Sequence, residues 1–274
     1  EADENGNVPA LHMAERGITL RAGPHAGRLI RPARVYREYE DVEATPKEER
    51  GYNTAIYSDD GGHTWHASAP FPERGTGEGA IVELADGTLY YSSRKHHFAD
   101  GEQFRSDRQY AWSEDGGETW VDPAYDETIP DGPRYRGSEG RGANFNGHFG
   151  MMGGLARLPI EGEDVLLYSN ADAENHQRRD LTVWASFDGG RTWPVKRRAH
   201  EEFGAYSSLV AGRPGTESEG WIYLLFEHGE PGDSDEESVA RIDYAGGTLA
   251  RFTLGWVVRG ERTGDGELPG WVVP

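Results

Sequence analysis

The 274-residue sequence contains no cysteine. Disulfide bonds, thiolate metal ligands and a cysteine nucleophile are therefore excluded. Lysine is also scarce: it occurs only at Lys47, Lys95 and Lys196, so nearly all of the 28 basic residues are arginine. The 48 acidic residues outnumber them and give a formal net charge of −20. Because so negative a surface repels nucleic acid and anionic membranes, a polyanion-binding role is not expected.

Long apolar runs and long helical patterns are missing as well. No apolar run approaches the ~20 residues that a membrane-spanning helix needs, and residues 1–9 lack the regions of a signal peptide. We therefore expect a soluble chain with no membrane span and no export signal in this sequence. No helical pattern exceeds ~10 residues. The 38 glycines and the 11% aromatic content are instead typical of short strands joined by tight turns.

One octapeptide occurs three times, at residues 58–65, 113–120 and 186–193, with the pattern S-x-D-x-G-x-T-W. Its serine and aspartate oxygens can accept hydrogen bonds from nearby amides, and its glycine can adopt a positive φ. The Thr-Trp pair can then enter a strand in which the indole is buried. Each copy follows a strand-like run, so the motif predicts three hairpin turns and has a structural role.

Further strand-like runs lie between and after these copies. The predicted strands are residues 52–57, 80–84, 88–92, 109–112, 164–169, 181–185, 221–226 and 250–258, with Asp86-Gly87 as a two-residue turn. The charged stretch 122–146 is predicted to be a loop. Repeats of roughly 40 to 70 residues with about four strands each are typical of β-propeller blades. The sequence therefore predicts an all-β propeller of four to five blades, forming a single domain over residues 1–274.

The octapeptides resemble the Asp-boxes, or bacterial neuraminidase repeats, of sialidases. Other segments look like consecutive parts of bacterial exo-α-sialidases, in the same order along the chain. These segments include Gly23–Ile30, Gly77–Gly87, Ser92–Arg94, Leu166–Asn170, Ala205–Leu209, Leu224–Glu227 and Ala250–Leu254. The resemblance covers nearly the whole chain and implies the six-bladed sialidase propeller, which we expect to be incomplete here.

The same resemblance implies roles for five residues. Tyr206 looks like the nucleophile, and Glu78 looks like the glutamate that takes its proton. Arg94 and Arg178 resemble the second and third of three arginines that bind the substrate carboxylate. Glu227 resembles the carboxylate that orients the first arginine. These residues lie far apart along the chain, so they would meet only where blades converge.

The residue types suit this chemistry. Sialic acid carries a carboxylate on its anomeric carbon, so a carboxylate nucleophile would approach a like charge. A tyrosine is neutral until a glutamate removes its proton, which explains the departure from the usual two-carboxylate scheme. Arginine binds carboxylates in bidentate fashion, and charges beyond ~8 Å are largely screened at physiological salt. Arg179 is a competing choice for the role given to Arg178.

Two parts of the family pattern are not found. The family's first arginine lies in an R-I-P tripeptide, followed by a loop aspartate that acts as the general acid. This sequence has no R-I-P, and Arg31-Pro32-Ala33 lies in a segment that matches a later strand. We infer that the sequence corresponds to the C-terminal two-thirds of a sialidase, or that the missing blades come from another chain.

A metal site is not expected. The ten histidines include the pair His96-His97, but adjacent residues on a strand point to opposite faces, and no H-E-x-x-H spacing occurs. A calcium loop at Ser58–Gly61 would lack its twelfth-position acid. The resemblance implies no cofactor either.

The leading hypothesis is a retaining exo-α-sialidase that removes terminal sialic acid from glycoconjugates. The resemblance implies a sialylated glycan as the substrate and a secreted, periplasmic or cell-surface location. One alternative is a non-catalytic propeller that binds sialylated glycans or a protein partner. Another is an Asp-box glycosidase that acts on a different acidic sugar. The oligomeric state is left open.

Overall fold

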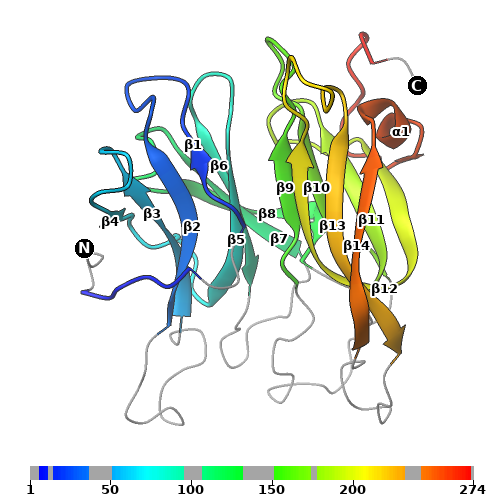
Figure 1. Cartoon of the computed structure of the whole chain (residues 1–274), viewed down its shortest axis with the longest axis horizontal. Helices are drawn as coiled ribbons and strands as arrows, with labels where there is room; N and C mark the ends of the chain where they lie inside the picture. Colours follow the sequence, from blue (N-terminus) through cyan, green and yellow to red (C-terminus); the bar gives the residue numbers. More distant parts are fainter. Residues whose placement is uncertain are drawn as a thin grey trace. The chain divides into compact units, whose positions relative to one another are not determined.

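The structure is a computed structural model that describes residues 6–11, 15–36, 51–95, 107–131, 151–173, 178–231 and 242–272. Within these ranges nearly all secondary structure is β-strand (Figure 1). The chain divides into two compact units, the first of Glu1–Asp126 and Gly137–Gly150 and the second of Glu127–Arg136 and Met151–Pro274. The prediction of a single domain stays a prediction.

The first unit contains two four-stranded sheets. One has the order β1-β2-β3-β4 and consists of β1 (Ile18–Thr19), β2 (Leu29–Tyr36), β3 (Gly51–Ser58) and β4 (His66–Ala67). The other has the order β5-β6-β7-β8 and consists of β5 (Thr76–Glu83), β6 (Leu89–Lys95), β7 (Asp107–Ser113) and β8 (Val121–Pro130). The last residues of β8 are counted with the second unit.

The two sheets of the first unit share a hydrophobic core. Ile30 of β2 and Leu89 of β6 both belong to it, and the ring of Trp120 meets the ring of Tyr91 edge-on, with centroids 4.7 Å apart. The turn glycine Gly117 lies against Ile30, where an added Cβ would be 2.1 Å from Cδ1. Burying an isoleucine side chain stabilises a fold by about 1.5–3 kcal/mol. The glycine therefore contributes close packing as well as a positive φ of 88°.

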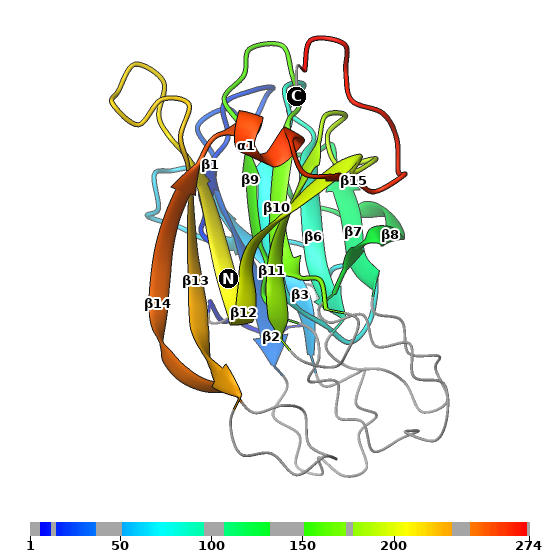
Figure 2. The ribbon, with the colours of Figure 1, turned by 90° about the vertical axis from the view of Figure 1, so that its right-hand side faces the viewer.

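The second unit contains one seven-stranded sheet of order β14-β13-β12-β11-β10-β9, in which β15 also pairs with β12. Its strands are β9 (Gly154–Arg157), β10 (Leu166–Ala171), β11 (Arg179–Ser186), β12 (Val195–Ala211), β13 (Ile222–Pro231), β14 (Ile242–Phe252) and β15 (Glu261–Arg262). Strand β12 pairs with β11 up to Phe203 and with β13 from Phe203 onward. It bends between these two halves (Figure 2). The sheet therefore contains two groups of strands. One runs from β9 to the first half of β12, and the other from the second half of β12 to β14. Together with the two sheets of the first unit, the described residues form four such groups.

The core of the second unit is built on the inner face of this sheet. Leu181, Val183 and Ala185 alternate along β11 and are fully buried, as is Leu209 on β12. The helix α1 (Leu254–Val258) adds the buried side chain of Val257 to the same cluster. The strand period of two residues places these apolar side chains on one face.

All three octapeptides form the predicted turn, with the same hydrogen bonds. The serine hydroxyl donates to the aspartate at 2.8, 2.7 and 2.8 Å, and the amide of the second glycine donates to the serine at 2.9, 2.8 and 2.8 Å. The aspartate also accepts the threonine hydroxyl at 2.6, 2.5 and 2.7 Å. The hydroxyl and amide of Thr64 and the hydroxyl of Ser58 hold the pKa of Asp60 well below its usual range. The motif therefore closes its turn with charge-assisted bonds.

The strand predicted at residues 250–258 is wrong in its second half. Strand β14 ends at Phe252, and Thr253 begins α1, because its side chain accepts a hydrogen bond from the amide of Trp256 at 3.3 Å. Val257 and Val258 are buried on this helix. A short apolar run does not distinguish a buried strand from a short helix.

The loop predicted at residues 122–146 is also wrong where the structure describes it. Residues 121–130 form β8, which lies at the edge of its sheet. Its charged residues are compatible with this position because edge strands tolerate proline and exposed charge. Residues 132–150 lie outside the described part of the chain, as do His96 and His97. No helix among the described residues is long and apolar enough to cross a membrane.

Candidate functional site

Glu78 and Arg94 form a buried ion pair in the first unit. Glu78 lies on β5 and Arg94 on the adjacent strand β6, and Oε2 of the carboxylate is 2.5 Å from Nη1 of the guanidinium. The two side chains are 0% and 1% exposed. Buried charges are stable only when they are paired and hydrogen-bonded. Each of these side chains therefore fixes the position of the other.

Glu78 occupies a β-bulge. Gly77 pairs with Arg94 and Gly79 pairs with Ser93, so Glu78 is an extra residue between two ladder pairs. Its φ of 58° lies in the left-handed region, which is unusual for a residue other than glycine. Such a conformation costs on the order of 1–3 kcal/mol and persists only when its surroundings hold it. Bulges re-aim a side chain, and they are frequent beside active sites.

The flanking glycines of this bulge both lie against buried side chains. A Cβ added at Gly79 would lie 2.2 Å from Cε2 of Tyr91, whose hydroxyl donates to the carbonyl of Thr54 at 2.7 Å. A Cβ added at Gly77 would lie 2.7 Å from Cζ of Arg34. The two glycines beside Glu78 therefore leave room for the side chains of Arg34 and Tyr91.

Two further arginines beside the bulge were not predicted from the sequence. Arg34 on β2 is 0% exposed, and its guanidinium packs against Gly77. Arg108 on β7 is 1% exposed and donates from Nη2 to the carbonyl of Glu78 at 2.9 Å. It also donates from Nε to the hydroxyl of Ser92 at 3.1 Å. The first unit thus buries three guanidinium groups around Glu78.

A signal for Arg108 exists in the sequence. Arg108, Tyr110 and Trp112 alternate along β7, and alternate residues of a strand share a face. Tyr110 and Trp112 both pack against Tyr90, with ring centroids 5.7 and 4.9 Å apart. An arginine in line with two packed aromatic residues is a candidate for a buried role.

Tyr206 lies in the second unit next to two other predicted site residues. The guanidinium carbon of Arg178 is 5.2 Å from the centroid of the Tyr206 ring. The amide of Tyr206 donates to Oε2 of Glu227 at 3.2 Å. All three side chains are half-buried. The structure therefore brings Arg178, Tyr206 and Glu227 together from three separate segments of the chain.

The backbone around Tyr206 is held by hydrogen bonds. The amide of Gly204 donates to the carbonyl of Arg178 at 2.9 Å, and the amide of Ser207 donates to the carbonyl of Met152 at 3.2 Å. The ladder between β12 and β13 shifts its register between Gly204 and Ser207, so Tyr206 lies within this irregularity. Tyr206 therefore lies where β12 departs from regular strand pairing.

Four of the five register shifts in the described strand pairings lie at or within two residues of a predicted site residue. The shift on β5 contains Glu78, and the shift between β12 and β13 contains Tyr206. One shift between β11 and β12 begins at Arg179, the residue after Arg178, and a second lies farther along, between Leu181 and Thr182. The shift between β13 and β14 follows His228, the residue after Glu227. Irregular backbone therefore occurs close to predicted site residues in both units.

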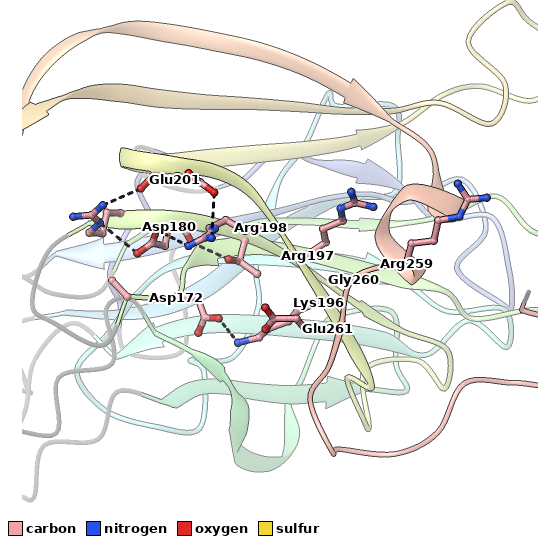
Figure 3. Close-up of a pocket in the computed structure, with 12 residues that line it drawn as sticks. Asp172, Asp180, Lys196, Arg197, Arg198, Glu201, Arg259, Gly260 and Glu261 are labelled. Carbon is pink, nitrogen blue, oxygen red and sulfur yellow. Dashed lines mark hydrogen bonds and ion pairs between the residues drawn. The ribbon is translucent and has the colours of Figure 1, made fainter. Parts of the chain in front are cut away.

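Arg179 has different surroundings from Arg178. Its Nε is 3.3 Å from Oδ2 of Asp180, and its Nη2 donates to the carbonyl of Glu201 at 3.2 Å. It lines a pocket of about 930 Å³ in the second unit, which the sequence did not predict (Figure 3). The pocket is lined by Asp172, Ala173, Arg179, Asp180, Thr182, Lys196, Arg197, Arg198, Glu201, Arg259, Gly260 and Glu261.

Most of the cations of this pocket are engaged by the protein itself. Lys196 pairs with Asp172 at 2.5 Å, and Arg198 pairs with Asp180 and Glu201 at 3.3 and 3.2 Å (Figure 3). Arg197 donates to the carbonyl of Trp256 at 2.8 Å. The pocket is therefore a network of ion pairs on the strands β11 and β12.

The structure thus groups the five predicted residues as two clusters. Glu78 and Arg94 meet in the first unit, and Arg178, Tyr206 and Glu227 meet in the second. Each cluster is described within its own unit. The prediction that all five residues share one site stays a prediction.

Comparison with known proteins relates the chain to sialidases. No protein-family model matches it. It is 33% identical to a sialidase of Micromonospora viridifaciens over 239 residues, which cover 87% of this chain and 31% of the relative. A sialidase of Vibrio cholerae serotype O1 is 29% identical over 233 residues, which cover 74% of this chain and 26% of the relative. The intramolecular trans-sialidase of Ruminococcus gnavus matches in structure with a TM-score of 0.59 and 22% identity, over 88% of this chain and 43% of that chain.

The antiparallel sheets and these matches define a β-propeller fold of the sialidase type, present here in part. The resemblance to the bacterial sialidase family is thereby confirmed: the chain is a relative of those enzymes. It spans between a quarter and a third of the length of the curated relatives it matches.

Proposed function

We propose that this chain carries catalytic and substrate-binding residues of a retaining exo-α-sialidase that removes terminal sialic acid from glycoconjugates. The observation that carries the proposal is the position of Glu78, Arg178, Tyr206 and Glu227 at or next to shifts in strand register. Bulges re-aim side chains and are over-represented next to active sites. The 33% identity to a sialidase supports the same assignment.

The proposed chemistry assigns a proton and a bond to each residue. Glu78 takes the phenolic proton of Tyr206, and the phenolate oxygen attacks the anomeric carbon of the sialic acid. The bond from that carbon to the glycosidic oxygen breaks, and the leaving oxygen gains a proton from a general acid or from water. Water then attacks the same carbon and gives up a proton to the conjugate base left by the first step. The bond to Tyr206 breaks, Glu78 returns its proton to the phenolate, and sialic acid is released with retained configuration.

The arginines supply the binding of the substrate carboxylate. Arg94 places its guanidinium beside Glu78, and a planar guanidinium can bind a carboxylate in bidentate fashion. Arg178 lies over the Tyr206 ring, where a bound carboxylate would be close to the nucleophile. Arg179 is committed to Asp180 and to the carbonyl of Glu201. We therefore assign the role of the third arginine to Arg178.

Hydrolysis of a fluorogenic aryl sialoside tests the proposal. Its phenolic leaving group departs with little assistance from a general acid, so turnover does not depend on an aspartate that the sequence did not identify. We expect turnover by the chain and a loss of at least about 100-fold in the Tyr206→Phe variant. Tyr223→Phe is the matched control, because Tyr223 is a half-buried tyrosine on β13 of the same sheet.

The contrary results are specific. If the parent chain binds sialic acid without turnover, it is a glycan-binding propeller and the proposal is wrong. If Tyr206→Phe retains parental turnover, the nucleophile is another residue.

A further inference from the structure

We infer that Arg108 is a positioning residue for Glu78, one that holds the backbone of the β5 bulge so that the Glu78 carboxylate meets Arg94. The effect of Arg108 on turnover rests on the proposed function. Its effect on the position of Glu78 rests on the first unit alone, because Glu78, Arg94 and Arg108 all belong to that unit.

The contacts of Arg108 point to this role. Arg108 lies on β7, Glu78 lies on β5, and β6 runs between these two strands. The Arg108 side chain is buried and reaches across β6 to donate from Nη2 to the Glu78 carbonyl at 2.9 Å. On the way, its Nε donates to the hydroxyl of Ser92 on β6 at 3.1 Å. One guanidinium therefore ties the bulge to the middle strand of the sheet.

The bulge needs such a tie because the regular ladder does not hold Glu78. Its neighbours Gly77 and Gly79 pair with Arg94 and Ser93, and Glu78 itself has no partner position in the register of β6. Its left-handed φ of 58° is disfavoured for a side chain with a Cβ. A fixed donor at the Glu78 carbonyl offsets this disfavoured backbone and keeps the extra residue in place.

The packing on either side holds the two flanking glycines in place. Tyr91 fills the space beside Gly79, and Arg34 fills the space beside Gly77. Within this frame, the direction of the Glu78 side chain depends on its own φ and ψ, which the bond to Arg108 fixes. Loss of that bond should therefore move the carboxylate relative to Arg94 without removing either group.

The position of Arg108 requires a side chain with two separate donor atoms. Two acceptors on different strands are bonded by two different nitrogens of Arg108. A lysine keeps the charge but presents its donors at a single point, so it cannot reproduce this pair of bonds. We therefore expect Arg108→Lys to recover only part of the function that Arg108→Met loses.

Steady-state kinetics with the fluorogenic sialoside test the inference. We expect Arg108→Met to lower kcat by about 100-fold, as a misplacement of about 1 Å does, with KM changed by less than about threefold. Arg28→Met is the matched control, because Arg28 is also a buried arginine of the first unit and is bound to Asp59 and Glu118. This control should lower thermal stability and leave kcat unchanged.

A crystal structure of Arg108→Met gives a readout that does not depend on activity. We expect the φ of Glu78 to leave the left-handed region and the carboxylate to separate from Arg94. If Glu78 keeps its conformation in that variant, the inference is wrong, even where stability falls. Equal loss of kcat in Arg28→Met and Arg108→Met would also overturn it, since a general loss of folding would explain both.

The two proposals fail in distinguishable ways. Absence of turnover in the parent chain contradicts the proposed function, and the φ of Glu78 in the variant then decides the inference by itself. Turnover in the parent with unchanged kcat in Arg108→Met contradicts the inference and leaves the proposed function intact.

Discussion

Arg178 and Arg179 are neighbours in the chain that the structure separates by their surroundings. Arg178 faces the Tyr206 ring, whereas Arg179 is bound to Asp180 and the Glu201 carbonyl. The resemblance left both open as the third arginine. Their contacts now give a prediction that discriminates between them.

Arg178→Met should raise KM for the sialoside by about 10-fold or more, because it removes a charge-assisted contact to the substrate carboxylate. Arg179→Met should change KM by less than about threefold, because its ion pair is partly exposed and contributes little. Initial rates over a range of sialoside concentrations measure both values. The reverse order of effects would assign the role to Arg179.

Asp115 of the second octapeptide gives a prediction on acid stability. Burial by itself raises the pKa of Asp115, but hydrogen bonds from Thr119 and Ser113 outweigh it and hold the pKa below its ordinary value of 3.8. The charged carboxylate therefore stabilises the fold above that value, and this stability is lost as the pH falls through the folded-state pKa. Asp115→Asn should cost about 1 kcal/mol at pH 7 and less at pH 3, which lies below the ordinary pKa of 3.8.

Urea unfolding at the two pH values measures this difference. Glu114→Gln is the control, because Glu114 is an exposed neighbour in the same turn and its loss should be neutral at both pH values. An equal effect of Asp115→Asn at pH 3 and pH 7 would contradict the role of the charged form.

The candidate site residues were predicted from the resemblance to sialidases and not from the residues taken alone. Glu78, with a glycine on each side, looks like an exposed turn residue when taken alone, yet its side chain is 0% exposed. Arg34 and Arg108 were missed because an arginine in isolation is most often at the surface. Burial of a charged side chain depends on which strands meet, so the alternation of Arg108 with Tyr110 and Trp112 indicates a shared face but does not by itself specify burial.

The bulge on β5 is the element on which the first cluster depends. Gly79→Ala should remove about 1–3 kcal/mol of stability, because the new Cβ would lie 2.2 Å from Tyr91 Cε2. It should also lower turnover, since relief of the clash displaces Glu78. Gly247→Ala on β14 is the matched control, because its Cβ would meet the nearest atom at an ordinary 3.7 Å. Thermal melts and initial rates of both variants test this, and a tolerated Gly79→Ala would contradict the account of the bulge.

In the helix α1, replacing a glycine by alanine should raise stability instead of lowering it. Gly255 is an interior helical residue, and a Cβ there would meet only the Thr253 hydroxyl at 3.7 Å. Gly255→Ala should therefore stabilise the chain by about 0.5–1 kcal/mol. The midpoint of urea unfolding measures the change.

Hairpins were predictable and the ends of elements were not. The octapeptides and Asp86-Gly87 each contain their own turn chemistry, so the strands beside them fall where expected. Strand β8 and helix α1 take their form from their neighbours: an edge position permits charge on β8, and a buried site for Val257 selects a helix. Such choices depend on tertiary packing, which local periodicity does not contain.

The whole molecule carries a net charge of −20, yet its predicted binding residues are arginines. Their local charge can dominate over a few ångströms because more distant acidic groups are screened. The fold and the relationship to sialidases were predictable because three copies of one turn and an ordered series of segments extend along the chain. That Glu78 and Arg94 converge with Tyr206 on one site stays a prediction of the resemblance, because the two groups of residues belong to different units.

Covalent labelling by a difluorinated sialic acid is the most direct test of that convergence. Fluoride leaves this reagent without a general acid, so labelling reports the nucleophile, its base and the arginines alone. We predict a sialyl adduct on Tyr206 in the parent chain, detected by mass spectrometry of its peptides, with slower labelling in Glu78→Gln and none in Tyr206→Phe. An adduct on another residue, or a labelling rate that Glu78→Gln leaves unchanged, would contradict a shared site.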